Sequence, residues 1–114
     1  MALRIESELA DPTQALATIQ AYLAAHPGDL TATTLLADVY RGRLADCTAA
    51  LPLYRSVAES RDPALSLNAR GWEGICAASL GHRYEAIPAL EDALRRGVRS
   101  PLREEVQLAL DALQ

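Results

Sequence analysis

Helix breakers recur along this chain at short intervals, and the segments between them have helical periodicity. The breaker clusters are ADP at residues 10–12, HPGD at 26–29, RGR at 41–43, RDP at 61–63, LGH at 80–82 and RGVRSP at 96–101. Between the first two clusters, Ala15, Ile19 and Leu23 fall at the spacing of one helix face. The pattern predicts seven short helices joined by short loops, so neighbouring helices should run antiparallel.

Capping residues indicate where these helices begin and end. Asp11 and Asp62 each precede a proline, which suits an acidic N-cap followed by proline at the first helical position. Ser100 before Pro101 predicts a third start of the same kind. Glycines that suit a left-handed C-cap or an interhelical turn stand at Gly28, Gly42, Gly81 and Gly97. The predicted helices include residues 11–25, 30–41, 45–59, 84–95 and 102–113, and residues 2–9 form a short stub before them.

Composition narrows the fold class and the possible partners. The chain has 114 residues, the length of one domain, and its apolar half is mostly alanine and leucine with no phenylalanine, which favours an all-α fold. The net charge is −4 and the arginines are interleaved with acids, so we expect no nucleic-acid binding. Neither a signal peptide nor an apolar run of about 18 residues is present, which predicts a cytoplasmic protein without a membrane span.

The cysteines and histidines give weak signals for chemistry. Cys47 and Cys76 are too few for a disulfide framework, and both fall in apolar helical patterns, so we expect two free thiols and a reducing compartment. These cysteines and His26 and His82 lack the close ligand pairs of structural zinc sites, so no metal is expected.

The stretch from His26 to Asp29 invites a catalytic or metal interpretation, because it places a histidine near a carboxylate. A histidine in the last turn of a helix also interacts favourably with the free carbonyls there, and Asp29 suits the N-cap of the next helix. We therefore interpret the stretch as the corner between two helices. No serine elbow and no glycine-rich phosphate loop occurs elsewhere, so neither an enzyme nor a cofactor is predicted.

A repeat of about 36 residues runs through the sequence. Pro27 and Pro63 are 36 residues apart and end comparable units, and Pro101 ends a third. Pro52 and Pro88 are separated by the same interval inside two predicted helices, where proline would disturb the helix. Small and larger apolar residues recur in register at Ala15 and Ile19, at Ala50, Tyr54 and Val57, and at Ala86, Leu90 and Ala93.

On these residues the chain resembles the tetratricopeptide repeat (TPR) family. The resemblance implies one domain, residues 1–114, of antiparallel helix–turn–helix repeats stacked as a short right-handed superhelix. Its units would be about 1–29, 30–63 and 64–100, with residues 101–114 as a C-terminal capping helix. The first unit would have only a stub, Ala2 to Leu9, as its first helix.

The resemblance also implies a function. In such a stack the first helix of each pair lines a concave groove, whose polar residues here would be Thr31, Thr34, Asp38, Arg41, Asn68 and Arg70. We expect a non-catalytic adaptor or chaperone that binds a peptide or helix of a partner protein in that groove. Two alternatives stay open: a structural protein that self-associates into a dimer or higher oligomer, and a carboxylate-binding patch formed by Arg95, Arg96, Arg99 and Arg103.

Overall fold

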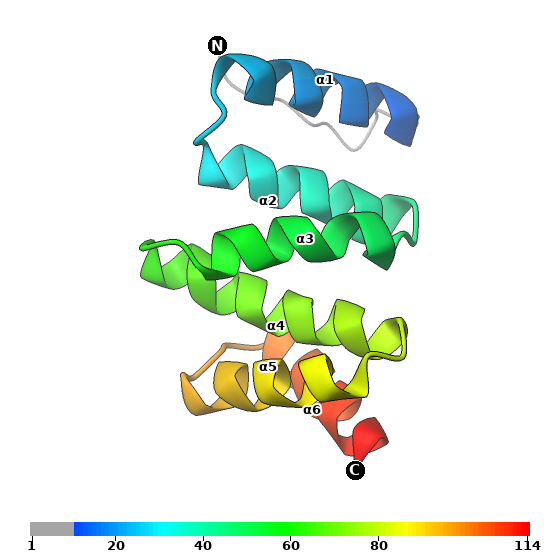
Figure 1. Ribbon diagram of the computed structural model, residues 1–114, viewed down its shortest axis with the longest axis vertical. Helices are drawn as coiled ribbons and strands as arrows, with labels where there is room; N and C mark the ends of the chain where they lie inside the picture. Colours follow the sequence, from blue (N-terminus) through cyan, green and yellow to red (C-terminus); the bar gives the residue numbers. More distant parts are fainter. Residues whose placement is uncertain (1–10) are drawn as a thin grey trace.

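The computed structural model of the chain describes residues 11–114, and this part is all-helical, as predicted (Figure 1). The predicted stub 2–9 lies outside the described residues. The elements are α1 (Pro12–Ala25), α2 (Leu30–Asp38), the π-helical turn η1 (Val39–Arg43), α3 (Cys47–Ala58), α4 (Pro63–Ser79), α5 (Arg83–Arg95) and α6 (Leu102–Leu113).

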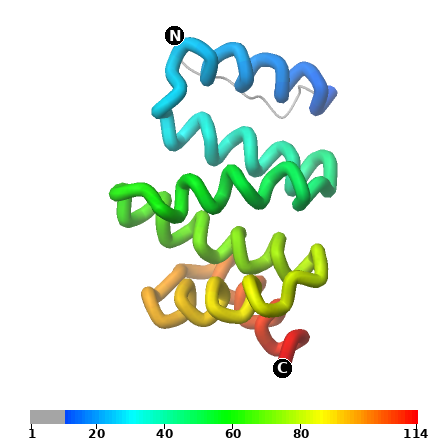
Figure 2. The backbone as a smooth tube through the Cα atoms, in the orientation of Figure 1, coloured from blue at the N-terminus to red at the C-terminus, as the bar shows by residue number. Residues whose placement is uncertain are grey.

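The helices are stacked along the long axis of the molecule. The principal extents are 42 × 28 × 23 Å, and the chain reverses direction at each loop between consecutive helices (Figure 2). Helix α4 lies at the centre of the packing, because it contacts α3 and α5, its neighbours in sequence, and also α2 and α6. Every other helix from α2 to α6 therefore meets α4.

The capping predictions are confirmed at two helix starts and wrong at the third. The Asp11 carboxylate accepts a hydrogen bond from the Thr13 amide at 2.9 Å, and Asp62 accepts one from the Leu65 amide at 3.0 Å. Ser100 does not cap α6, because Pro101 occupies the N-cap position. The Ser100 hydroxyl donates instead to the Glu104 carboxylate.

The predictions for the turn glycines are also only partly confirmed. Gly81 and Gly97 adopt the predicted left-handed backbone, with φ of 79° and 86°. Gly28 has no positive φ but lies in the turn between α1 and α2, which also agrees with the prediction. Gly42 does not fit the prediction, because it lies inside the π-helical turn that continues α2 beyond Asp38. The left-handed residue of that connection is Ala45, with φ of 51°.

The predicted repeat positions form the core. Ala15 and Ile19, Ala50 and Tyr54, and Ala86 and Leu90 are all 0% exposed, one pair each on α1, α3 and α5. The small residue of each pair lies one turn before the larger one, so both point to the same side of their helix. Pro52 and Pro88 occupy the sixth residue of α3 and α5, and both helices continue through them.

Glycine allows α4 to approach its neighbours closely. A Cβ atom added at Gly74 would lie 2.7 Å from the Leu90 side chain on α5 and 3.0 Å from the Leu90 backbone nitrogen. One added at Gly71 would lie 3.2 Å from Val106 on α6. Both glycines of the stretch GWEG, residues 71–74, therefore allow close helix packing.

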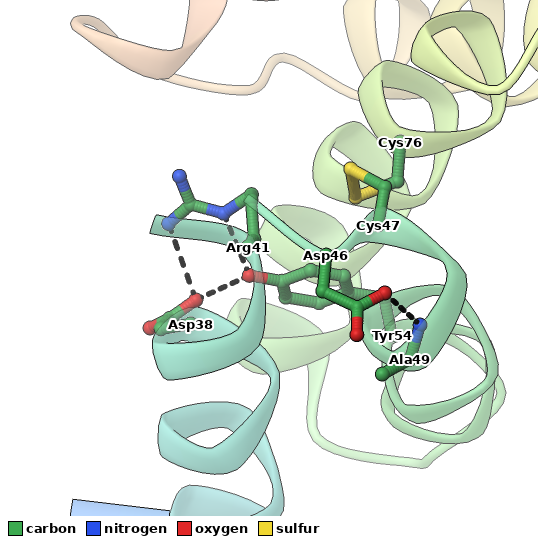
Figure 3. The surroundings of a disulfide bond; sticks show 7 residues. All are labelled: Asp38, Arg41, Asp46, Cys47, Ala49, Tyr54 and Cys76. Atoms are coloured by element: carbon green, nitrogen blue, oxygen red, sulfur yellow. Dashed lines mark hydrogen bonds and ion pairs between the residues drawn. A yellow bond between two sulfur atoms is a disulfide. The ribbon is translucent and has the colours of Figure 1, made fainter. Parts of the chain in front are cut away.

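The prediction of two free thiols is wrong. Cys47, the first residue of α3, is disulfide-bonded to Cys76 near the end of α4, with their Cα atoms 5.1 Å apart (Figure 3). The two helices run antiparallel, so the start of one lies beside the end of the other although 29 residues separate the cysteines in sequence. The argument for a reducing compartment therefore no longer holds. None of the described helices is long and apolar enough to cross a membrane.

Candidate functional site

The four predicted groove residues of the second unit form one stripe along α2 and η1. Thr31 is exposed, and Thr34, Asp38 and Arg41 are partly exposed. Their spacing of three and four residues keeps them on one side of the helix, opposite buried Leu36. The Thr34 hydroxyl donates to the Leu30 carbonyl at 2.8 Å, so it is occupied within its own helix.

Asp38 and Arg41 are tied to the core through Tyr54 of α3. The Tyr54 hydroxyl donates to the Asp38 carboxylate, and Arg41 Nε donates to the Tyr54 hydroxyl at 2.9 Å (Figure 3). Arg41 Nη2 lies 3.4 Å from the same carboxylate. Burial, and then the bond to Asp38, raise the pKa of Tyr54. The hydroxyl therefore stays protonated and joins the buried ring to the surface pair.

Trp72 of α4 completes this cluster, and its contacts with Arg41 and Tyr54 were not predicted from the sequence. The Arg41 guanidinium lies 3.5 Å from the centre of the Trp72 ring, a cation–π contact, and the Tyr54 and Trp72 rings are stacked with centroids 6.4 Å apart. Trp72 is only partly buried and is the only tryptophan in the chain. The presence of a single tryptophan in the sequence pointed to this position, but the sequence alone does not show that Arg41 contacts it.

The two predicted groove residues on α4 lie on different sides of that helix. Asn68 is exposed and lines a pocket of about 340 Å³ with Ala64, Leu67, Gly97 and Arg99. Arg70, two residues later, points to the side covered by α3 and α5. Two residues along a helix correspond to a rotation of about 200°, so Arg70 faces away from Asn68. Arg70 bonds Asp92 of α5 and is not part of the α2 stripe.

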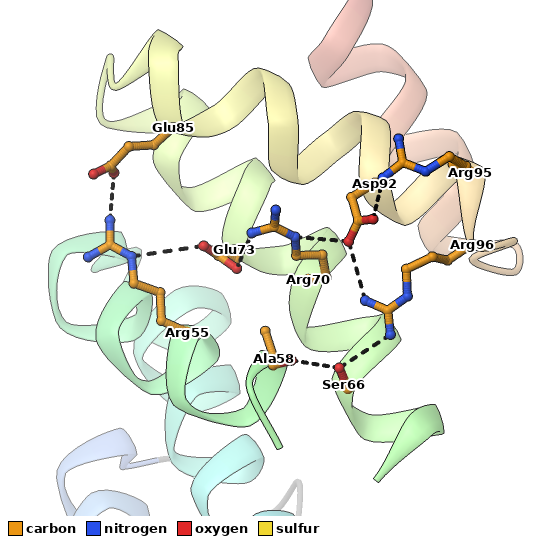
Figure 4. A network of polar contacts seen from close by, with 9 residues as sticks. All are labelled: Arg55, Ala58, Ser66, Arg70, Glu73, Glu85, Asp92, Arg95 and Arg96. Atoms are coloured by element: carbon orange, nitrogen blue, oxygen red, sulfur yellow. Dashed lines mark hydrogen bonds and ion pairs between the residues drawn. The ribbon is translucent and has the colours of Figure 1, made fainter. Parts of the chain in front are cut away.

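Arg70 belongs to a charged network across α3, α4 and α5 (Figure 4). It bonds Glu73 and Asp92, each at 3.1 Å, while Arg55 of α3 lies 3.9 Å from Glu73 and also pairs with Glu85. Together with neighbouring side chains these groups line a pocket of about 320 Å³. Arginines and carboxylates balance one another in this lining, so the network is suited to joining helices.

Asp92 is the carboxylate on which most of this network converges. It accepts from Arg70, from Arg95 at 2.6 Å and from Arg96 at 3.3 Å, and Arg96 also reaches the buried Ser66 hydroxyl. Burial by itself raises the pKa of Asp92, but the hydrogen bonds from Arg70 and Arg96 outweigh it and lower that pKa. The folded chain therefore holds Asp92 ionised more strongly than the unfolded chain does.

Replacing Asp92 with asparagine is expected to lower the free energy of unfolding by about 1–2 kcal/mol at neutral pH, because charge-assisted bonds are lost. Since the folded pKa lies below the ordinary 3.8, the contribution of Asp92 is present above that value and is lost as pH falls through the folded pKa. Urea unfolding of both chains at neutral and acidic pH should show their difference shrinking in acid. A difference that grows in acid would contradict the assignment.

The four arginines considered as a carboxylate-binding patch have different partners in the structure, apart from Arg95 and Arg96, which share Asp92. Arg95 and Arg96 are bound to Asp92, and Arg103 donates to the Val98 carbonyl. Arg99 lines the pocket beside Asn68. Two of the four guanidiniums are therefore already paired with a carboxylate of the chain itself.

His26 and Asp29 form the helix corner that the sequence predicts. His26 is the C-cap residue of α1, with Nδ1 3.2 Å from the Tyr22 carbonyl oxygen and its ring stacked on Tyr22. Asp29 caps α2 by accepting from the Ala32 amide at 3.0 Å, and it accepts from the Tyr22 hydroxyl at the same distance. The Ala32 amide and then the Tyr22 hydroxyl lower the pKa of Asp29.

The disulfide occupies both cysteine sulfurs that a zinc site with His26 and His82 would need. Among residues 11–114, no group of three or more histidine, cysteine, aspartate or glutamate side chains is arranged to hold a metal ion.

Comparisons with known protein families, with curated proteins and with solved structures found no match to this chain.

Proposed function

We propose that the protein is a TPR-like interaction module that binds a peptide or helix of a partner protein along the stripe on α2 and the neighbouring face of α4. The observation that carries this proposal is the Arg41–Trp72 contact, which joins the polar stripe on α2 and η1 to a partly exposed aromatic ring of α4. Tryptophan, tyrosine and arginine are the residues most enriched where binding energy concentrates.

The packing of alternate helices supports the TPR-like part of the proposal. If α2, α4 and α6 are the first helices of successive units, a superhelical stack requires each to touch the next. Helix α4 does contact both α2 and α6, while α1, α3 and α5 carry the recurring pairs of a buried alanine and a larger buried residue. The stripe residues then lie on the layer of first helices, where such stacks bind their partners.

The cluster around Tyr54 determines which variants can test this face. Charge reversal at Asp38 and Arg41 would disturb the buried Tyr54 hydroxyl, so a loss of binding would not distinguish the surface from the core. Thr31 is a better probe, because it is exposed and stands at the second position of α2, after the Asp29 cap. Thr48 is a matched control: it is exposed at the second position of α3, after the equivalent Asp46 cap.

Thr31→Glu is expected to abolish or strongly reduce capture of a partner from a native cell extract, whereas Thr48→Glu should leave it unchanged. Both substitutions place an acid in the first turn of a helix, which the helix dipole favours, so neither should reduce helicity. Mass spectrometry of the retained proteins identifies the partner, and circular dichroism checks the fold.

Equal capture by the two glutamate variants would remove the α2 stripe from consideration. Recovery of copies of this chain alone would favour self-association instead. Leu108 of α6, whose side chain is largely exposed, is the first position to test in that case.

A further inference from the structure

The Cys47–Cys76 disulfide lies at the edge of the same cluster that forms the candidate binding face. Cys76 and Trp72 are four residues apart on α4, one helical turn. Cys47 begins α3 directly after the connection from α2 that carries Arg41. The connection between α2 and α3 is thus fastened to α4 at two points, covalently at Cys76 and by the Arg41 contact at Trp72.

The fastened connection does not have regular backbone geometry. It contains the π-helical turn η1, closed by a hydrogen bond from the Leu44 amide to the Val39 carbonyl at 3.2 Å. Ala45 then has a positive φ of 51°, which is unfavourable for a residue with a Cβ atom. The Asp46 amide bonds the Tyr40 carbonyl at 2.8 Å, next to Arg41. Because this backbone conformation is unfavourable, the segment relies on the Cys47–Cys76 bond and the Arg41–Trp72 contact to hold it in place.

We infer that Cys47–Cys76 is a thiol-exchange site whose redox state sets the packing of Arg41 on Trp72 and thereby the shape of the candidate binding face. The inference rests on the proposed function only for its biological consequence. The bond joins α3 to α4, which belong to the proposed units 30–63 and 64–100, so its cleavage removes the covalent tie between these two units.

The two cysteines differ in exposure to solvent, which determines which sulfur an incoming thiolate attacks. Cys47 is partly exposed at the N-terminus of α3, whereas Cys76 is 0% exposed. A thiolate of a small dithiol attacks the Cys47 sulfur, and the electron pair of the S–S bond leaves with Cys76, which takes up a proton. The second thiol of the reagent then attacks the mixed disulfide, forms a cyclic disulfide and releases Cys47. The reagent is oxidised and the protein gains two thiols.

Trp72 gives a direct readout, because it is the only tryptophan. The purified full chain is compared before and after treatment with dithiothreitol, by titrating its thiols and by acrylamide quenching of its fluorescence. We expect no free thiol and a shielded Trp72 before treatment, then two thiols, stronger quenching and a red-shifted emission afterwards. Circular dichroism should show that the helices persist.

The control is the double variant Cys47→Ser, Cys76→Ala, which should show the stronger quenching without any reagent and no response to it. Arg41→Gln, which removes the guanidinium from the Trp72 ring, should raise quenching in the oxidised chain as well. Identical quenching of the oxidised and fully reduced chains would overturn the inference, as would thiols that titrate freely before treatment. Collapse of the helical signal on reduction would also overturn it, since the bond would then support the whole fold.

A partner that the unsubstituted chain captures and the Thr31→Glu variant loses separates this inference from the proposed function. Capture by the reduced chain should be several-fold weaker than by the oxidised chain if the exchange regulates binding. If neither form captures a partner, the proposed function fails while the fluorescence result still decides the exchange site.

Discussion

Tyr54→Ala is expected to lower the free energy of unfolding by about 3–5 kcal/mol, the range for truncating a buried aromatic side chain. Tyr54 is among the largest fully buried side chains and lies 0% exposed in the main core, between α2, α3 and α4. Its removal leaves a cavity beneath Trp72 and deprives Asp38 and Arg41 of the hydroxyl that joins them. Urea unfolding followed by circular dichroism measures the loss.

Tyr54→Phe separates the packing contribution from the polar one. The ring stays in place and only the hydroxyl is lost, so we expect a smaller cost of about 1 kcal/mol, since water can reach the partly exposed Asp38 and Arg41 and replace the bonds. If both chains lost about 3–5 kcal/mol, the hydrogen-bond cluster and not the ring would dominate at this position. If both chains lost only about 1 kcal/mol, the core position of Tyr54 would be wrong.

Local chemistry made most helix boundaries predictable. An aspartate followed by proline suits a helix start, because the acid can cap the helix and proline fits its first position, and α1 and α4 begin there. Alanine paired with a larger apolar residue four positions later indicates the buried face of a helix, and those positions on α1, α3 and α5 are buried. Ser100 failed where the aspartates succeeded, because Pro101 itself stands at the N-cap position and no side chain caps that end of α6.

The candidate site was only partly predictable, because its residues depend on how helices are rotated against one another. The α2 stripe follows from one helix period, and the structure keeps Thr31, Thr34, Asp38 and Arg41 on one side. Asn68 and Arg70 needed the register of α4, which the sequence left open. The contact of Arg41 with Trp72 joins residues 31 positions apart across a π-helical turn that no periodic pattern indicates.

The disulfide escaped prediction for a related reason: two cysteines define no framework, and only the antiparallel packing of α3 on α4 brings them together. The number of cysteines indicates whether a small domain depends on several disulfides for its stability, but it does not give the distance between two thiols. The observed bond allows an expectation for the free energy of unfolding that is lost when it is reduced.

Reduction of Cys47–Cys76 is expected to lower the free energy of unfolding by about 3–4 kcal/mol, the chain-entropy value for a loop of the 29-residue separation observed here. Oxidised and reduced wild-type chains are the fairest comparison, because Cys76 is fully buried and any substitution there changes packing as well. The double variant Cys47→Ser, Cys76→Ala should unfold near the reduced chain and be insensitive to dithiothreitol.

Equal urea midpoints for the oxidised and reduced chains would show that the bond does not restrict the unfolded state. A domain of this size commonly has only about 5–15 kcal/mol of stability, so the expected loss is a large share of the total without abolishing folding. The bond joins α3 to α4, and Cys76 lies within one turn of α4 from Trp72, which Arg41 contacts. Global stability and the shape of the candidate face should therefore respond to the same reductant, the first by a shift in midpoint and the second by exposure of Trp72.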